Sequence, residues 1–305
     1  MPRIRITCSI LCYNYGRFLA KAIDSCLDQK PGDFEREVLV IDDGSTDDTP
    51  QLCARYGSAI RVVRSRNQGF GASLTKAISL ARGDYVCLLD ADDYFAPQKL
   101  ATLTPHLQAG AALIYDRKYF IDAEDNTLDE TPGDGGNTST VTVHRATAET
   151  LLPAENELFF DAVRASRQFV RLAEPLTYYR RHASSMSRCE EPGKWASELA
   201  GATHHLADRL LAGPPLPWIS TLSVQLAWGR LYRSQACYKE LEAALECGLI
   251  GASLRSCVRM LWFAMRSPEG LSSFHVRMIG KTLIRRPSFP RRRSSASDST
   301  LGKRI

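Results

Sequence analysis

The stretch Val38-Leu39-Val40-Ile41-Asp42-Asp43-Gly44-Ser45 is an apolar run that ends in two carboxylates and a turn. The stretch Leu88-Leu89-Asp90-Ala91-Asp92-Asp93 follows the same pattern further along the chain. Short apolar runs that are rich in β-branched residues and end in Asp or Gly are typical of buried strands. Each stretch therefore predicts a strand that ends in a cluster of acidic side chains.

Strands and helices alternate on both sides of these two stretches. The patterns predict strands at 4–11, 37–41, 60–64 and 84–89, and helices at 16–28, 50–56 and 71–81. This alternation and spacing predict an α/β fold with a mainly parallel central sheet.

The pattern changes after residue 110. Two further strands are predicted at 111–119 and 140–145, on either side of a loop rich in Gly and Asp, and only helical periodicity is seen from 190 to 284. We therefore expect three parts: a catalytic-type α/β domain at 1–188, a helical C-terminal region at 189–286 and a basic tail at 287–305.

Composition excludes several classes of protein. With 44% hydrophobic and 24% charged residues, the chain is not intrinsically disordered as a whole. It has no run of about 18 apolar residues, the length of a membrane-spanning helix, and its N-terminus does not resemble a secretory signal. The nine cysteines are scattered singly without CxxC spacing, which favours buried reduced thiols over a zinc site or a disulfide framework. These features predict a cytosolic protein.

Positive charge is concentrated at the C-terminus. The net charge is +5, but eight Lys or Arg and one acid follow residue 280, so the first 280 residues are near −2. The Ser-, Pro- and Arg-rich tail is predicted to be disordered. Its Arg291-Arg292-Arg293 run could hold an anionic membrane surface, and a solubilising tail without a partner is the alternative. Nucleic acid is not expected as a partner, because the rest of the chain is slightly acidic and carries no recognisable binding motif.

Five carboxylates should meet at one edge of the predicted sheet. Ligands bind beyond the carboxyl ends of parallel strands, where Asp42 and Asp43 follow one strand and Asp90, Asp92 and Asp93 follow another. Crowded carboxylates repel one another unless a cation or ligand compensates them. The Asp-x-Asp spacing lets alternate oxygens face one hard cation, and oxygen ligands favour Mg²⁺ or Mn²⁺. Helix capping and turn formation are the alternative use of these residues.

Several motifs in order resemble one enzyme family. The segment Ser9-Ile10-Leu11-Cys12-Tyr13-Asn14-Tyr15, followed by residues 40–47, resembles the nucleotide-binding start of family-2 glycosyltransferases with the GT-A fold. Asn67-Gln68-Gly69, residues 88–93 and the segment Pro175-Leu176-Thr177-Tyr178-Tyr179-Arg180-Arg181-His182 resemble its later signatures. The resemblance spans roughly residues 4 to 187. It implies an inverting transferase with a nucleotide-sugar donor, a UDP-sugar being expected first, and Mg²⁺ or Mn²⁺. The implied acceptor is a glycan or lipid-linked precursor of the cell envelope or of an exopolysaccharide.

The resemblance also implies a role for each matching residue. Tyr13 and Asp43 match residues that hold the nucleotide base, and Asp42 lies beside them for the ribose or the turn. Asp90 matches the aspartate that contacts ribose and metal, and Asp92 matches the direct metal ligand. Asn14 and Asn67 complete the implied nucleotide-sugar site. Arg180 and His182 match positions near the phosphates, with packing and capping as their alternative role.

The acceptor base is expected in the stretch Pro153-Ala154-Glu155-Asn156-Glu157-Leu158. The family usually has an acidic pair before a leucine-rich helix, and alignment from Leu158 puts Glu155 at the base position. Ala154 replaces the acidic neighbour, and Glu157 is the rival candidate, with Asp161 a third. The altered pair keeps a second interpretation open, a non-catalytic binding module on the same fold. A sugar nucleotidyltransferase is a further alternative, although the Gly-rich, Lys- or Arg-bearing loop that this class needs after the first strand is missing.

Overall fold

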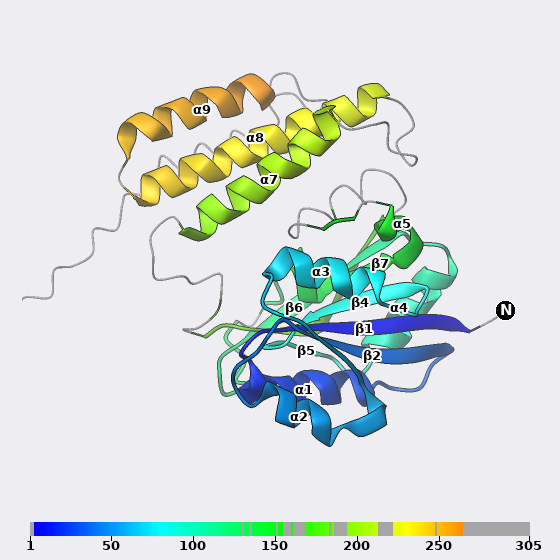
Figure 1. The fold of residues 1–305 in the computed structure, drawn as a ribbon. Coiled ribbons are helices and arrows are strands. Elements are labelled where there is room, and N and C mark those ends of the chain that lie inside the picture. Colours follow the sequence, from blue (N-terminus) through cyan, green and yellow to red (C-terminus); the bar gives the residue numbers. More distant parts are fainter. Residues whose placement is uncertain are drawn as a thin grey trace, which may run out of the picture.

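The computed structural model describes residues 3–129, 131–133, 136–150, 152–154, 160, 169–182, 185, 194–212, 222–247 and 249–264. Its N-terminal part is one mixed sheet with helices on both faces (Figure 1). The strands are β1 (Ile4–Cys12), β2 (Phe34–Asp42), β3 (Arg61–Arg64), β4 (Tyr85–Asp90), β5 (Tyr94–Phe95), β6 (Leu113–Ile121), β7 (Val141–His144) and β8 (Phe169–Arg180). The helices of this part are α1 (Gly16–Leu27), α2 (Thr49–Arg55), α3 (Phe70–Ser79), α4 (Lys99–Gln108) and α5 (Arg145–Glu149).

The strand order of the sheet is β3-β2-β1-β4-β7-β6-β8-β5. Strands β1 to β4 run parallel to one another, β7 runs antiparallel to β4 and β6, and β6 pairs in parallel with β8. The predicted α/β class with a mainly parallel sheet is confirmed.

This order creates a topological switch point beside β1. The chain runs outward from β1 to β2 and β3, then crosses to the other side of β1 to form β4, whose Asp90 pairs with Leu11. Open α/β sheets bind their ligands at such a point, beyond the carboxyl ends of the strands. The acidic stretches after β2 and β4 lie at this edge.

Two apolar clusters hold the helices to the sheet. On one face, the side chains of Ile6, Cys8 and Ile10 in β1 pack with α1, α2 and α4. On the other face, Leu39 and Ile41 of β2 pack with α3 and α5. The two sets alternate along the strands because successive side chains point to opposite faces. Both faces of the central strands are therefore buried, which leaves the strand ends for ligands.

The structure contains elements that the sequence patterns did not predict. Helix α4 includes Pro105, and β8 has an irregular pattern of exposed and buried residues along its length. β5 is only two residues long and pairs antiparallel with β8. β8 is an important addition, because it carries Arg180 and leads directly to His182 at the ligand-binding edge.

The C-terminal described elements are three helices, α7 (Lys194–Ala212), α8 (Leu222–Glu246) and α9 (Ile250–Ala264). Helix α8 lies between the other two (Figure 1). Helical structure in this region matches the prediction, and the predicted helical residues after 264 and the basic tail lie outside the described residues. No helix in the described part of the chain is long and apolar enough to cross a membrane.

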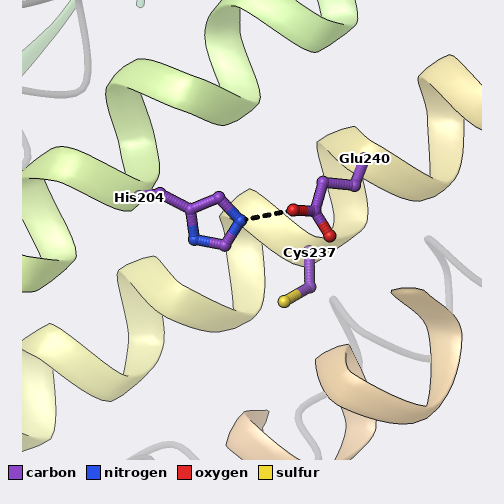
Figure 2. Close-up of side chains that lie close together, drawn as sticks. All are labelled: His204, Cys237 and Glu240. Atoms are coloured by element: carbon purple, nitrogen blue, oxygen red, sulfur yellow. Dashed lines mark hydrogen bonds and ion pairs between the residues drawn. The ribbon is translucent and has the colours of Figure 1, made fainter. Parts of the chain in front are cut away.

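A polar cluster joins these helices (Figure 2). Arg233 donates to Nδ1 of His204 at 3.0 Å, so Nε2 carries the proton and donates to Glu240 at 2.7 Å. The other Glu240 oxygen accepts from Ser256 and Arg259 of α9. Cys237 lies within 4.8 Å of the His204 and Glu240 donor atoms, and burial raises the pKa of its thiol to about 11.

The donor set of Figure 2 would suit a transition metal, but its hydrogen bonds argue for another role. A metal would have to displace the His204–Glu240 hydrogen bond and remove a proton that the thiol retains at neutral pH. The ion pair between Arg233 and Asp208 and that between Arg259 and Glu240 also balance charge locally. We therefore assign the cluster to the packing of α7, α8 and α9. Of the eight cysteines in the described residues, Cys237 included, six are buried, as predicted; Cys189 lies outside the described residues.

Candidate active site

The turn after β4 presents the predicted metal-binding aspartates. The backbone N–H of Ala91 donates to Leu11 O at 3.0 Å, which ties the turn to the end of β1. The backbone N–H of Asp90 donates to the Ser139 hydroxyl at 3.0 Å. These two hydrogen bonds fix the backbone on both sides of the Asp90 side chain. The backbone of this turn is thus held in place at the switch point.

Asp92 and His182 meet across this edge. Nε2 of His182 lies 3.0 Å from Oδ2 of Asp92, and Nδ1 of His182 lies 3.4 Å from the Arg17 guanidinium. An arginine can only donate, so Nδ1 is the acceptor and Nε2 carries the hydrogen that binds Asp92. The His182 ring also packs against Phe18, with ring centroids 5.0 Å apart. His182 is therefore held in one orientation by α1 and in turn orients the Asp92 carboxylate.

Arg180 is buried beside the turn that carries Asp92. It is 2% exposed, and its guanidinium donates to the backbone oxygens of Asp92, Asp122 and Ala123 and to the Asp125 carboxylate. Four of its five N–H groups are therefore used within the protein. The side chain supports the turn that carries Asp92 and ties it to the loop after β6. This geometry favours positioning of the turn over direct phosphate contact.

Asp42 and Asp43 are both buried at the end of β2. Asp42 accepts from Ser45 N at 2.8 Å and pairs with Arg64 at 3.2 Å. Asp43 accepts from the backbone N–H groups of Gln68 and Gly69 at 2.8 to 3.1 Å. Asp43 therefore orders residues 68–69. A nucleotide base bound here would share a carboxylate that already accepts hydrogen bonds from two backbone N–H groups.

The remaining predicted nucleotide residues lie on exposed loops. Tyr13 is 44% exposed and follows β1 directly, so its ring is accessible to a base. Asn14 adopts a positive φ of 58°, which Asn tolerates better than most residues, and its side-chain oxygen accepts from Thr46 N at 2.7 Å. Asn67 is exposed and accepts from Gly69 N. Asn14 joins two loops of the site rather than pointing freely into solvent.

Ser139 is a residue that the sequence analysis missed. Its fully buried hydroxyl accepts from Asp90 N and donates to Oδ2 of Asp93 at 2.5 Å. Its carbonyl accepts from Lys99, which forms a buried ion pair of 2.7 Å with Asp116. Burial and then the charge of Asp92 raise the pKa of Asp93 well above its usual range. Asp93 is thus part of the support beneath the turn, whereas Asp90 and Asp92 are partly exposed.

Tyr15 is a second missed residue. Burial, and after it the negative charges of Asp92 and Asp90, raise the pKa of its hydroxyl. Both aspartates therefore contribute to the electrostatic environment of Tyr15. Its ring packs edge-on against His182, with centroids 5.6 Å apart. Tyr15 ends the motif at residues 9–15, but only the fold shows that its ring lies beside His182, the partner of Asp92.

The donor set at this edge fits a divalent cation. Asp90 and Asp92 offer carboxylate oxygens, which suit Mg²⁺ or Mn²⁺, and the Asp92 side chain is 14% exposed, so a ligand can reach it. Within the described part of the chain, His182 is the only basic side chain paired with the Asp92 carboxylate. A histidine that hydrogen-bonds a ligating carboxylate is a frequent second-layer partner in metal sites.

The candidate bases Glu155 and Glu157 lie outside the described residues, as does Asp161. Residues on both sides of the two glutamates, Ala154 and Phe160, are 1% exposed and belong to the apolar cluster on the α3 face. The backbone of Ala154 also exchanges hydrogen bonds with the Thr75 hydroxyl of α3. An acidic side chain at position 154 would be buried here, which explains why alanine stands in this place.

Comparison with known proteins agrees with this geometry. Residues 7–151 match the sequence profile of Glycosyl transferase family 2. An uncharacterized glycosyltransferase of Nostoc is 33% identical over 137 residues, which are 43% of this chain and 42% of the relative. Chondroitin synthase of Escherichia coli is 30% identical over 124 residues, 39% of this chain and 18% of the relative. The chain thus spans less than half the length of these two relatives.

The similarity to solved structures extends over most of the chain. Residues 1–349 of TarS from S. aureus, solved with UDP-GlcNAc, superpose with a TM-score of 0.61 at 15% identity, covering 92% of this chain and 88% of TarS 1–349. The mannosyltransferase PcManGT from Pyrobaculum calidifontis, solved with GDP-Man and Mn²⁺, gives a TM-score of 0.50 at 16% identity, with the same coverage of each chain. Residues 7–151 are thus similar to Glycosyl transferase family 2, and the chain has the GT-A fold of these glycosyltransferase structures.

Proposed function

We propose that the chain transfers a sugar from a nucleotide-diphosphate donor to an acceptor hydroxyl, with inversion and with a divalent cation held by Asp90 and Asp92. The observation that carries this proposal is the Asp92–His182 pair at the switch point, beside the fixed Asp90. Structures of TarS with UDP-GlcNAc and of PcManGT with GDP-Man support a nucleotide sugar as the donor class. A UDP-sugar is the donor that we would test first.

The chain's residues have separate tasks in this proposal. The exposed Tyr13 ring packs on the base, and Asp43 and Asn67 lie beside it. Asp90 and Asp92 hold Mg²⁺ or Mn²⁺, which would neutralise negative charge on the departing diphosphate. His182 keeps the Asp92 carboxylate in position, and the Tyr15 ring packs against His182.

Sugar transfer with inversion at the anomeric carbon requires one general base. The acceptor hydroxyl attacks the anomeric carbon opposite the nucleotide and must lose its proton as the bond forms. A carboxylate within about 3 Å of the hydroxyl is the simplest proton acceptor. We assign this role to Glu155, with Glu157 as the rival. The acceptor is proposed to be a glycan or a lipid-linked precursor of the cell envelope or of an exopolysaccharide.

The organisation of the chain belongs to the same proposal. The catalytic domain extends over 1–188, the helical region over 189–286 and the basic tail over 287–305. The free cysteines suit a reducing compartment, so we place the enzyme in the cytosol. The positive charge of the tail would let it associate with the inner face of the membrane.

A turnover assay tests this function. The wild-type chain is incubated with a panel of UDP- and GDP-sugars and Mn²⁺, and release of the nucleoside diphosphate is measured without acceptor and with candidate glycan or lipid-linked acceptors. We expect release that EDTA stops and that Mn²⁺ restores. Metal-dependent binding of a nucleotide sugar without any turnover would instead favour the non-catalytic binding module. Formation of a sugar nucleotide from a sugar phosphate and a nucleoside triphosphate would favour the nucleotidyltransferase.

A further inference from the structure

Helix α9 has an exposed face on which apolar and basic side chains alternate. Val258 is 59% exposed and Trp262 is 47% exposed. Arg255 and Arg259 are exposed on the same helix. The four residues follow the spacing i, i+3, i+4 and i+7, which places them on one side of a helix. We call this set the α9 face.

The opposite side of α9 is packed on α8. Met260 is fully buried and its carbonyl accepts from Ser234 of α8 at 3.0 Å. Ser256 is 7% exposed and donates to Glu240 of α8 at 3.1 Å. Helix α9 lies on the far side of α8 from α7 (Figure 1). Val258 and Trp262 therefore lie on a side of α9 that these contacts do not use, whereas Arg259, also partly exposed, reaches back to Glu240 of α8 at 3.2 Å.

Charge in this part of the sequence is strongly one-sided. After Glu246, the chain contains twelve Lys or Arg and two acids, a net charge of +10. Since the whole chain carries +5, the first 246 residues carry −5. No Asp or Glu occurs between Glu246 and Glu269, the segment that contains the whole of α9. A segment with this positive charge is attracted to an anionic surface.

We propose that the α9 face docks onto an anionic lipid bilayer, with Val258 and Trp262 in the interfacial layer and Arg255 beside lipid phosphates. Trp is enriched at membrane–water interfaces, where its ring is apolar and its N–H is polar. Helices with one apolar and basic face bind anionic bilayers through both apolar burial and charge. The docking does not depend on the proposed transferase activity.

A second copy of the chain fits this face less well. Two-fold contacts bring the same patch of each subunit together, so Arg255 and Arg259 would meet the same cations of the other copy. Such like-charge contacts are unfavourable. Lipid phosphates avoid this repulsion, and the bilayer also buries both apolar side chains.

Membrane binding through the α9 face should differ from membrane binding through the basic tail in its sensitivity to salt. Attachment through the charges of the basic tail is released by salt, because exposed charges are screened within about 10 Å at 0.1 M salt. Apolar burial is much less sensitive to salt. The docked α9 face therefore predicts residual binding at high salt and after removal of residues 287–305.

Vesicle flotation of the full-length chain tests the proposal. The lipids are phosphatidylcholine with about 30% phosphatidylglycerol, or phosphatidylcholine alone, in about 0.1 M salt. We expect wild-type protein to float with the anionic vesicles and the double variant Val258→Ser/Trp262→Ser to lose at least about tenfold in partitioning. The matched control is Leu80→Ser/Leu128→Ser, which removes two apolar side chains that are 39% and 47% exposed elsewhere. This control should stay within about twofold of wild type.

The same double substitution in a chain ending at residue 286 separates the helix from the tail. We expect the shortened chain to retain binding and the added substitutions to remove it. The proposal is overturned if the Val258/Trp262 variant floats like wild type, or if wild type does not bind anionic vesicles. It is also overturned if light scattering shows a dimer that these substitutions dissociate while vesicle binding is unchanged, because a second copy then occupies the face.

Discussion

Nε2 of His182 lies 3.0 Å from Oδ2 of Asp92, and the Arg17 guanidinium on Nδ1 leaves the ring proton on the Asp92 side. His182 follows β8 and Asp92 follows β4, so this hydrogen bond joins two strand ends that are 90 residues apart in sequence. It orients the carboxylate that the proposed mechanism uses as a metal ligand.

Replacement of His182 should weaken metal binding without destroying the fold. His182→Gln removes the ring that fixes the Asp92 carboxylate, and loss of such an outer partner typically lowers metal affinity by about 10- to 100-fold. Titration of Mn²⁺ in the presence of nucleotide measures the change. His106→Gln on α4, outside the site, is the control and should bind Mn²⁺ like wild type. An unchanged Mn²⁺ affinity in His182→Gln would show that the Asp92–His182 pair does not support a metal site.

Arg180 should matter more for stability than a residue that contacts only ligand. Arg180→Met leaves four acceptor oxygens around the site without their donor, including the carbonyl of Asp92. Leaving a buried acceptor without its donor costs about 1 to 3 kcal/mol. Urea denaturation should therefore show a lower free energy of unfolding even without nucleotide. A variant as stable as wild type that has lost only phosphate affinity would restore the ligand role that the resemblance implied.

The hydrogen bonds of Glu37 predict that the stability of the folded protein depends on pH. Burial tends to raise the pKa of its carboxyl, but hydrogen bonds from Arg61, Thr7 and the Arg82 backbone outweigh burial and lower it from its ordinary value of 4.5. A lowered pKa in the folded state stabilises the protein above the ordinary pKa, and this contribution is lost as pH falls through the folded value. Glu37→Gln should cost about 1 to 2 kcal/mol at pH 7.

Urea denaturation of wild type and Glu37→Gln at several pH values checks this sign. The difference between the two free energies of unfolding should shrink as the pH falls below about 4.5. Glu35→Gln, at an exposed position of the same strand, should show little difference at any pH. A difference that grows toward acid pH would contradict the assignment of the three hydrogen bonds to a charged Glu37.

Much of the sheet could be predicted because local sequence patterns mark its strands. β1, β2 and β4 each contain a short run of apolar residues, and α1 and α3 have one apolar face each, so burial by the rest of the fold agrees with the local pattern. The acidic ends of β2 and β4 were also predictable, since parallel strands end at one edge.

The parts that sequence reasoning missed depend on distant contacts. β8 has no regular alternation, and its strand form results from its pairing with β6. Ser139 and Lys99 have no local signal of function, because their partners Asp90 and Asp116 come from other strands. Asp116 in the middle of an apolar strand was the one available hint of a buried ion pair.

The identity of the base is tested by two matched variants. Glu155→Gln should retain donor affinity but lower turnover by roughly 100-fold or more, the usual contribution of a general base, whereas Glu157→Gln should do much less. Steady-state turnover together with calorimetric donor affinity separates the two effects. The reverse ranking would assign the base to Glu157, and two fully active variants would contradict an inverting mechanism based on this segment.

The central claim is that Asp92 holds a cation that binds the nucleotide diphosphate, and calorimetry with UDP- and GDP-sugars tests it most directly. Each ligand is titrated into wild type and Asp92→Asn, with Mn²⁺ and with EDTA, after thermal denaturation has shown that the variant is folded. We predict that wild type binds at least one nucleotide sugar only with Mn²⁺ and that folded Asp92→Asn does not. Undiminished Mn²⁺-dependent binding by the variant, or no binding of any nucleotide sugar by wild type, would contradict the account.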